Sequence, residues 1–202
     1  MKCLRFLAAA ALILVSAPAF AQLYLYAGAG GGNPKFNQDD FFVGLQTLRR
    51  DDTKDSTYQG GIGYRFNPYW AVEVGAADLG EYSLDHFAID SFFFGNELTA
   101  RYKVKGVKTA VLGIYPATER FHLFGKLGIA STKAEVEGSF NGSPFTAEDK
   151  RNSLLAGFGV QYFIWRHLGV RAEFENWGEV GNERDTGRAK MATWNLQAVF
   201  SF

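Results

Sequence analysis

WNLQAVFSF, residues 194–202, closes the sequence and decides its fold. Side chains on an extended strand point alternately to opposite faces, so the alternation in this stretch predicts a strand with two unlike faces. One face carries Trp194, Leu196, Ala198, Phe200 and Phe202, and the other carries Asn195, Gln197 and Ser201. Chain termini are usually polar and loose. An apolar strand that ends on an aromatic residue therefore predicts the closing strand of a barrel in lipid.

The opposite end of the sequence has the pattern of a secretory signal peptide. Lys2 and Arg5 precede an apolar run at residues 6–15, and a small-x-small cleavage pattern ends at Ala21. The run is too short to span a bilayer. We expect residues 1–21 to be removed and residues 22–202 to form the mature barrel domain. Cys3, the single cysteine, leaves with the signal, so we expect no disulfide, metal site or cofactor.

The composition narrows the class of protein. Aromatic residues make up 16% of the chain and 23 residues are glycine, which is unfavourable in helices but acceptable in curved barrel strands. No basic block stands out, so nucleic-acid binding is not expected. No other segment reaches the length of a transmembrane helix. A soluble all-β domain and a membrane barrel both remain open at this point.

Seven earlier segments alternate in the same way as the terminal one. They cover residues 22–31, 57–66, 70–80, 100–115, 121–135, 152–164 and 168–177. Short connections at 67–69, 116–120 and 165–167 alternate with long polar ones at 32–55, 81–99, 136–151 and 178–190. Short periplasmic turns and long outer loops are typical of outer-membrane barrels. We therefore expect an all-β fold, an eight-stranded antiparallel up-and-down transmembrane β-barrel. For residues 107–115 the sequence does not decide which side chains point inward and which point outward, so the facing of residues 107–115 stays open.

The distribution of charge and aromatic side chains separates a membrane barrel from a soluble barrel such as a lipocalin. Charged residues share a face with glycines, as in Glu73 beside Gly75 and Lys126 beside Gly128. The opposite face carries aromatic residues near the expected membrane borders, namely Tyr64, Phe66, Trp70, Tyr162, Trp194 and Phe202. An aromatic girdle around an aliphatic band favours the membrane barrel.

Several short segments, in their order and spacing, resemble the transmembrane domain of the outer-membrane protein A (OmpA) family. They are Gly63-Tyr64-Arg65-Phe66-Asn67-Pro68-Tyr69, Glu73-Val74-Gly75, Gly159-Val160-Gln161-Tyr162, Val170-Arg171-Ala172-Glu173-Phe174 and Val199-Phe200-Ser201-Phe202. The resemblance covers essentially all of residues 22–202. It implies an integral protein of the Gram-negative outer membrane with a structural, envelope-supporting and surface-display role and a narrow pore or none. The family's peptidoglycan-binding domain has no counterpart here, so cell-wall tethering is not expected.

The resemblance also implies a charge network inside the barrel. By position, Glu73, Lys126, Arg171 and Glu173 look like its members. Gln161 stands where the family often has a carboxylate, and Leu112 where it can have a lysine, so we expect a reduced network. The residue pattern by itself also predicts that these charged side chains face the barrel interior, because a lipid-facing Arg or Lys at mid-membrane costs about 2–4 kcal/mol. An eight-stranded barrel is just filled by its side chains, so structural pairing is preferred over an ion path.

The alternation of the last strand resembles the signal by which the outer-membrane assembly machinery recognises its clients. The members of this C-terminal assembly signal would be Trp194, Leu196, Ala198, Phe200 and Phe202. Simple contact with lipid explains the same residues and is compatible with that role. Lipid and lipopolysaccharide of the outer membrane are the other expected partners.

The loops carry two alternatives to a purely structural role. Phe87, Phe92, Phe93 and Phe94 gather apolar surface that would suit an adhesin with an extracellular partner, or would pack a projecting hairpin. His86 lies near Ser83, Asp85, Asp90 and Ser91, a set that a lipid A-modifying enzyme could use. Spacing alone shows no rigid catalytic arrangement, so we expect no enzyme and no catalytic residues. Arg101, Lys103 and Lys105 would meet lipopolysaccharide phosphates at the outer rim, or are ordinary solvated charges.

Overall fold

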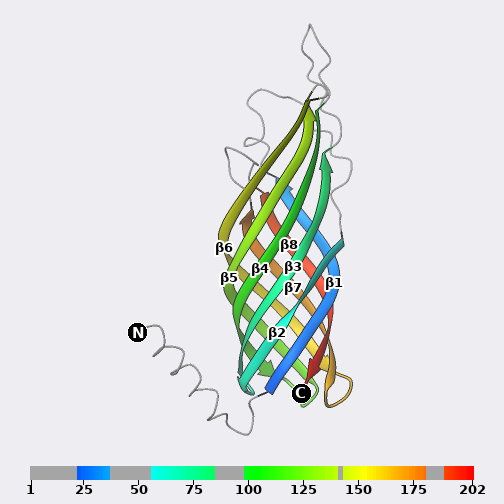
Figure 1. Cartoon of the computed structure of the whole chain (residues 1–202). Coiled ribbons are helices and arrows are strands. Elements are labelled where there is room, and N and C mark those ends of the chain that lie inside the picture. Colours follow the sequence, from blue (N-terminus) through cyan, green and yellow to red (C-terminus); the bar gives the residue numbers. More distant parts are fainter. Residues whose placement is uncertain (1–21, 37–55, 85–97, 141–142, 181–188) are drawn as a thin grey trace, which may run out of the picture.

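The computed structural model describes residues 22–36, 56–84, 98–140, 143–180 and 189–202, which form one closed barrel of eight antiparallel strands (Figure 1). The strands are β1 (Gln22–Phe36), β2 (Ser56–Asn67), β3 (Trp70–Leu84), β4 (Leu98–Pro116), β5 (Phe121–Phe140), β6 (Ser143–Phe163), β7 (Leu168–Val180) and β8 (Ala189–Ser201). The predicted fold class is confirmed. No helix in these ranges is long and apolar enough to cross a membrane.

The barrel closes between its first and last strands. β1 pairs with β8 from Tyr24 opposite Ser201 to Phe36 opposite Ala189, and the Phe202 N–H donates to the carbonyl of Leu23 at 3.0 Å. β1 therefore begins where β8 ends, at the lower end of the barrel in Figure 1. Closure leaves no sheet edge within the barrel, and in lipid each unpaired backbone group would cost several kcal/mol.

Short polar turns form the lower end of the barrel, as the sequence predicts. In the turn between β2 and β3, the Asn67 carboxamide oxygen accepts hydrogen bonds from the backbone N–H groups of Tyr69 and Trp70, at 2.8 and 3.0 Å. In the turn between β4 and β5, the Thr118 hydroxyl accepts from the Phe121 N–H at 2.9 Å. Side-chain acceptors of this kind satisfy backbone donors that no neighbouring strand reaches.

The upper end of the barrel is uneven, because β4, β5 and β6 run to 19, 20 and 21 residues and stand above the other strands in Figure 1. The expected long loop at 136–151 is wrong, since β5 and β6 pair through it up to Phe140 opposite Ser143. This part of the hairpin has no apolar face toward lipid, and its polar, charged sequence is therefore typical of a loop. The backbone pairing of the two strands continues through it, and at its base an ion pair joins Lys133 and Glu148 at 2.9 Å across the strands.

Two glycines with positive φ mark register shifts near the upper end of the shorter strands. Gly80 has φ 102° and Gly178 has φ 74°, and each lies at an irregularity in the pairing of its strand. In both places a side chain two residues earlier accepts from the glycine N–H, Asp78 at 3.2 Å and Asn176 at 2.9 Å. Only glycine adopts this backbone readily, so both bulges depend on it.

The two faces of the sheet differ sharply in character. The outer face exposes a broad apolar band, with Leu127 and Phe158 each 64% exposed and Leu154 71% exposed. In β4, which the sequence left open, Val107 and Val111 point outward while Lys108 is buried inside. An apolar exterior around a polar interior is the reverse of a lipocalin, so the soluble alternative is excluded.

Candidate functional site

Six charged side chains converge in the middle of the barrel and form what we call the interior charge network. Glu73 comes from β3, Lys108 from β4 and Lys126 from β5, and β7 supplies three members; together they are Glu73, Lys108, Lys126, Arg171, Glu173 and Glu175. None of the six is more than 4% exposed. Three carboxylates meet three cations, so the network is balanced in charge. Buried charges persist only when they are paired in this way.

Lys126 lies at the centre of the network. Its Nζ is 2.8 Å from Glu73 Oε2, 2.8 Å from Glu173 Oε2 and 3.1 Å from Glu175 Oε1. The contacts to Glu173 and Glu175 are hydrogen bonds, and the contact to Glu73 is an ion pair. This one side chain therefore links the carboxylates of β3 and β7 across the interior.

Arg171 holds the lower side of the network. Its Nη1 donates to Glu73 Oε1 at 2.6 Å, and its Nε and Nη2 donate to Gln161 Oε1 at 3.1 and 2.9 Å. The Tyr24 hydroxyl donates to the same Glu73 oxygen at 2.8 Å. The guanidinium carbon lies 4.8 Å from the centre of the Phe124 ring, a cation–π distance. Inward Gly63 makes room for Tyr24, since a Cβ there would collide with the ring.

Lys108 holds the upper side. Its Nζ donates to both Glu175 oxygens, at 2.5 and 2.6 Å, and to Gln59 Oε1 at 2.7 Å. The same ammonium lies 5.2 Å from the centre of the Trp177 ring. Lys108 thereby joins the charged layer to the apolar side chains above it.

The structure brings the predicted network residues together and adds two that the sequence reasoning missed. Glu73, Lys126, Gln161, Arg171 and Glu173 are connected by the bonds given above, and their role stays a prediction. The expected reduction at positions 161 and 112 stays a prediction, and Lys108 and Glu175 are two further charged members of the network. The signal for Glu175 was its alternation with Arg171 and Glu173. Lys108 could have been found from its alternation with Leu112, which is indeed inward and buried.

An apolar layer closes the interior above the charge network. It consists of Leu79, Tyr82, Tyr102, Trp177 and Met191, none more than 1% exposed. The Trp177 indole N–H donates to the Thr193 hydroxyl at 3.2 Å, so its polar atom is satisfied. This layer leaves the upper interior filled by side chains.

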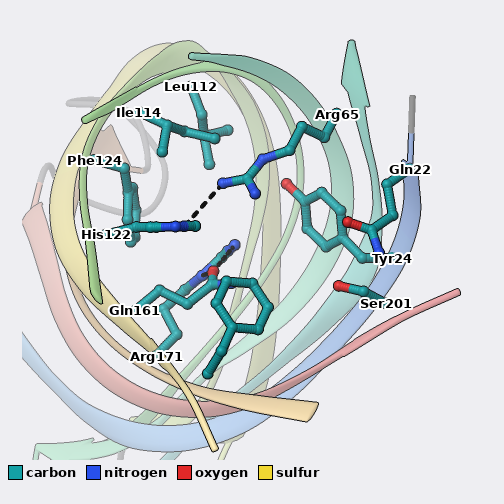
Figure 2. A pocket seen from close by; sticks show the side chains of 11 residues that line it. Gln22, Tyr24, Arg65, Leu112, Ile114, His122, Phe124, Gln161, Arg171 and Ser201 are labelled. Atoms are coloured by element: carbon teal, nitrogen blue, oxygen red, sulfur yellow. Dashed lines mark hydrogen bonds between the residues drawn. The ribbon is translucent and has the colours of Figure 1, made fainter. Parts of the chain in front are cut away.

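A small cavity lies below the network, at the periplasmic end of the barrel (Figure 2). Its volume is about 10 Å³, which is at the lower limit for a single water. Arg65 and His122 meet across it, with Nη2 and Nδ1 3.1 Å apart. Figure 2 shows the side chains of Tyr24, Gln161 and Arg171 directed into the same space. The lower interior is thus almost as full as the upper.

The other sequence-predicted residues fall in three places. In the last strand Trp194, Leu196 and Phe202 are 63%, 60% and 61% exposed on the outer face, while Asn195, Gln197 and Ser201 are buried inside. The signal peptide at 1–21, His86 and the aromatic residues Phe87, Phe92, Phe93 and Phe94 lie outside the described residues. The described ranges contain no group of three side chains suited to hold a metal ion.

The predicted basic rim is only partly free to meet phosphates. Arg101 Nε is 2.8 Å from Glu81 Oε1, and Lys103 Nζ is 3.5 Å from Glu81 Oε2. Lys105 makes no ion pair with any residue that the structure describes. Two of the three predicted cations are therefore already paired within the protein.

A closed eight-stranded barrel with an apolar exterior and a neutralised, filled interior defines the class of small membrane-spanning β-barrels. Within that class, the chain belongs to the OmpA-like transmembrane domain family, whose model matches residues 21–202. It is an integral β-barrel protein of the cell outer membrane.

Relatives and solved structures agree with this assignment. Outer membrane protein A of Shigella flexneri is 32% identical over 130 residues, 62% of this chain and 34% of that protein. Outer membrane protein A of Klebsiella pneumoniae is 27% identical over 178 residues, 82% of this chain and 48% of that protein. The chain thus spans between a third and half of the length of these curated relatives. The crystal structure of Ail, the attachment invasion locus protein of Yersinia pestis, in complex with the heparin analogue sucrose octasulfate shares the fold. Its TM-score is 0.59 at 18% identity, and the match covers 91% of this chain and 99% of Ail.

Proposed function

We propose that this protein is a non-conducting structural barrel, which supports the outer membrane and displays its upper hairpins at the cell surface. The observation that carries the proposal is the filled interior: the charge network and the apolar layer occupy successive levels of the same lumen. A hydrated ion would have to separate Lys126 from three carboxylates. Breaking a buried ion pair costs roughly 3–5 kcal/mol, so an ion path through this level is strongly disfavoured.

Planar bilayer recordings test this proposal. The refolded full chain is expected to insert without steady conductance, because side chains of the described residues occupy the lumen at the level of the charge network and of the apolar layer. A matched variant, Lys126→Ala, removes the central cation and opens space at the same level. If the unsubstituted protein shows long-lived, uniform channels of the kind that a porin gives, the structural role proposed here is wrong.

The boundaries of the mature protein belong to the same proposal. Processing after Ala21 leaves Gln22 as the first residue, and β1 begins at that residue. Its side-chain Nε2 donates to the carbonyl of Phe202 at 3.1 Å, which supports a domain of residues 22–202 with both ends at the periplasmic face.

The outer face of β8 supports a role as an assembly signal. Deletion of Phe202 is expected to lower the yield of folded protein in the outer membrane of cells, because the machinery loses its terminal aromatic contact. Refolding of the same variant into detergent micelles, without machinery, is expected to change much less. Equal losses in both measurements would show that Phe202 acts only in packing, and an unchanged cellular yield would contradict the signal role.

An enzyme is not part of this proposal. The matched family is a transmembrane domain, the relatives are outer membrane proteins A, and Ail is an attachment invasion locus protein; on this basis we expect no catalytic activity. The adhesin alternative depends on the aromatic residues at 87 and 92–94 and stays a prediction of the sequence. Among partners, lipid and lipopolysaccharide have the clearest support, because the exposed apolar band must be covered by lipid.

A further inference from the structure

Three lysines from neighbouring strands stand side by side on the outer face of the barrel. Lys105 of β4 is directly opposite Lys133 of β5, and Lys133 is directly opposite Lys150 of β6. All three point outward, with Lys105 and Lys150 exposed and the Lys133 side chain 36% exposed. We call Lys105, Lys133 and Lys150 the lysine row. The residues lie far apart in the sequence, and only the register of the strands aligns them.

The height of the lysine row on the barrel is informative. Along β4 the outward residues below Lys105 are Val107, Thr109, Val111, Gly113 and Tyr115. The ten steps along the strand from Tyr115 to Lys105, at about 3.3 Å each and tilted about 40°, rise roughly 25 Å. That rise matches the apolar band of an outer-membrane barrel, so the lysine row lies where the outer leaflet's headgroups begin.

The charge pattern changes at this level. The next outward row up places Lys103 opposite Glu135, and Glu135 opposite Glu148, so it mixes both signs. The next row down, Val107 with Ser131 and Asn152, carries no charge. The only row of like charges on these three strands is therefore the one at the membrane interface.

The protein itself neutralises only the middle of the lysine row. Lys133 Nζ lies 2.6 Å from Glu135 and 2.9 Å from Glu148. Lys105 and Lys150, on either side, make no ion pair within the described ranges. Asp78 is opposite Lys105 in the register, but its carboxylate accepts from the Gly80 N–H at 3.2 Å and forms no ion pair with Lys105.

Like charges placed directly opposite one another on a sheet are destabilising unless a counter-charge is present. We propose that the lysine row binds the phosphate groups of an outer-leaflet lipid, with Lys105 and Lys150 as the main contacts and the acyl chains against the apolar band below. A phosphorylated lipid fits because the charge and the apolar surface are continuous on the same three strands. This inference rests on the proposed function only in requiring the barrel to sit in the outer membrane.

Titration of the refolded full chain in neutral detergent with fluorescent diphosphorylated lipid A tests the inference. Lys105→Gln with Lys150→Gln is expected to weaken binding about 30-fold, because each lysine near an anionic surface adds about fivefold in affinity. The matched control, Arg101→Gln with Lys103→Gln, removes two charges from cations already paired with Glu81. The control is expected to change binding by less than about threefold. Heat-modifiable gel mobility checks that both variants fold.

Three results would overturn the inference. They are unchanged binding in the lysine variant, an equal loss in the control variant, and equal binding of dephosphorylated lipid A. Competition by soluble inositol hexakisphosphate at similar concentrations would identify a free-phosphate site and contradict the lipid assignment. The proposed function fails separately, since conductance measured on the same preparation is independent of lipid A binding.

Discussion

The charge network and the apolar layer fill the same lumen in opposite ways. In the charge network, position is set by ion pairs, and Lys126 alone contacts three carboxylates. In the apolar layer, bulky side chains such as Trp177 and Met191 fill space, and no member carries a charge. In the charge network, loss of one partner leaves a buried charge without its counter-charge. In the apolar layer, loss of a side chain removes only packing contacts. We therefore expect one substitution in the charge network to lower the free energy of unfolding by more than one substitution in the apolar layer.

Lys126→Met is expected to have the larger effect. It leaves Glu73, Glu173 and Glu175 with one cation fewer inside the barrel, and removal of one member of a buried pair costs roughly 3–5 kcal/mol. Denaturant titration in detergent or lipid vesicles, followed by tryptophan fluorescence, measures the free energy of unfolding.

The double variant Lys126→Met with Glu173→Gln is the control, because it removes one charge of each sign from the network. It is expected to recover part of the loss. If it is as unstable as the sum of its single variants, the charges are not coupled and the comparison between the two layers breaks down.

Trp177→Phe is expected to have the smaller effect, about 1 kcal/mol. The substitution keeps an aromatic ring in the apolar layer but removes the hydrogen bond from the indole to Thr193, and one such bond is worth about 0.5–1.5 kcal/mol. Thr193→Val removes the same bond from the other side, together with the bond that the Thr193 hydroxyl accepts from Asn195 Nδ2 at 3.2 Å. Only the part of the two losses that comes from the shared bond should fail to add. A loss that approaches the Lys126→Met value would show that the apolar layer is as cooperative as the charged one.

The sequence predicted the fold because alternation with period two assigns each side chain to a face. Together with the family resemblance, it assigned Glu73, Lys126, Arg171 and Glu173 to the inward face, and the structure buries all four side chains. It could not say which inward residues of different strands share a level, because the stagger between strands is not visible in alternation. The facing of residues 107–115 was also open, so the sequence did not predict that Lys108 lies inside next to Glu175.

The sequence did not predict the upper part of the β5–β6 hairpin, for a related reason. Residues 136–151 alternate weakly, because above the membrane neither face needs to be apolar. Pairing there depends on contacts between strands, such as Lys133 with Glu148. The sequence points to Lys105 at the outer rim but not to the lysine row, since Lys105 and Lys150 are neighbours of Lys133 only through the register.

The seam between β1 and β8 has a consequence for the order of events during biogenesis. β1 is the first of the eight strands to be synthesised, and its partner on one side is the last, with Tyr24 finally meeting Ser201. Until the end of the chain arrives, one edge of β1 has no partner from its own molecule. Contacts so distant in sequence form slowly, so we expect the β1–β8 seam to close last and, until then, β1 and β8 each to have one strand edge without its partner.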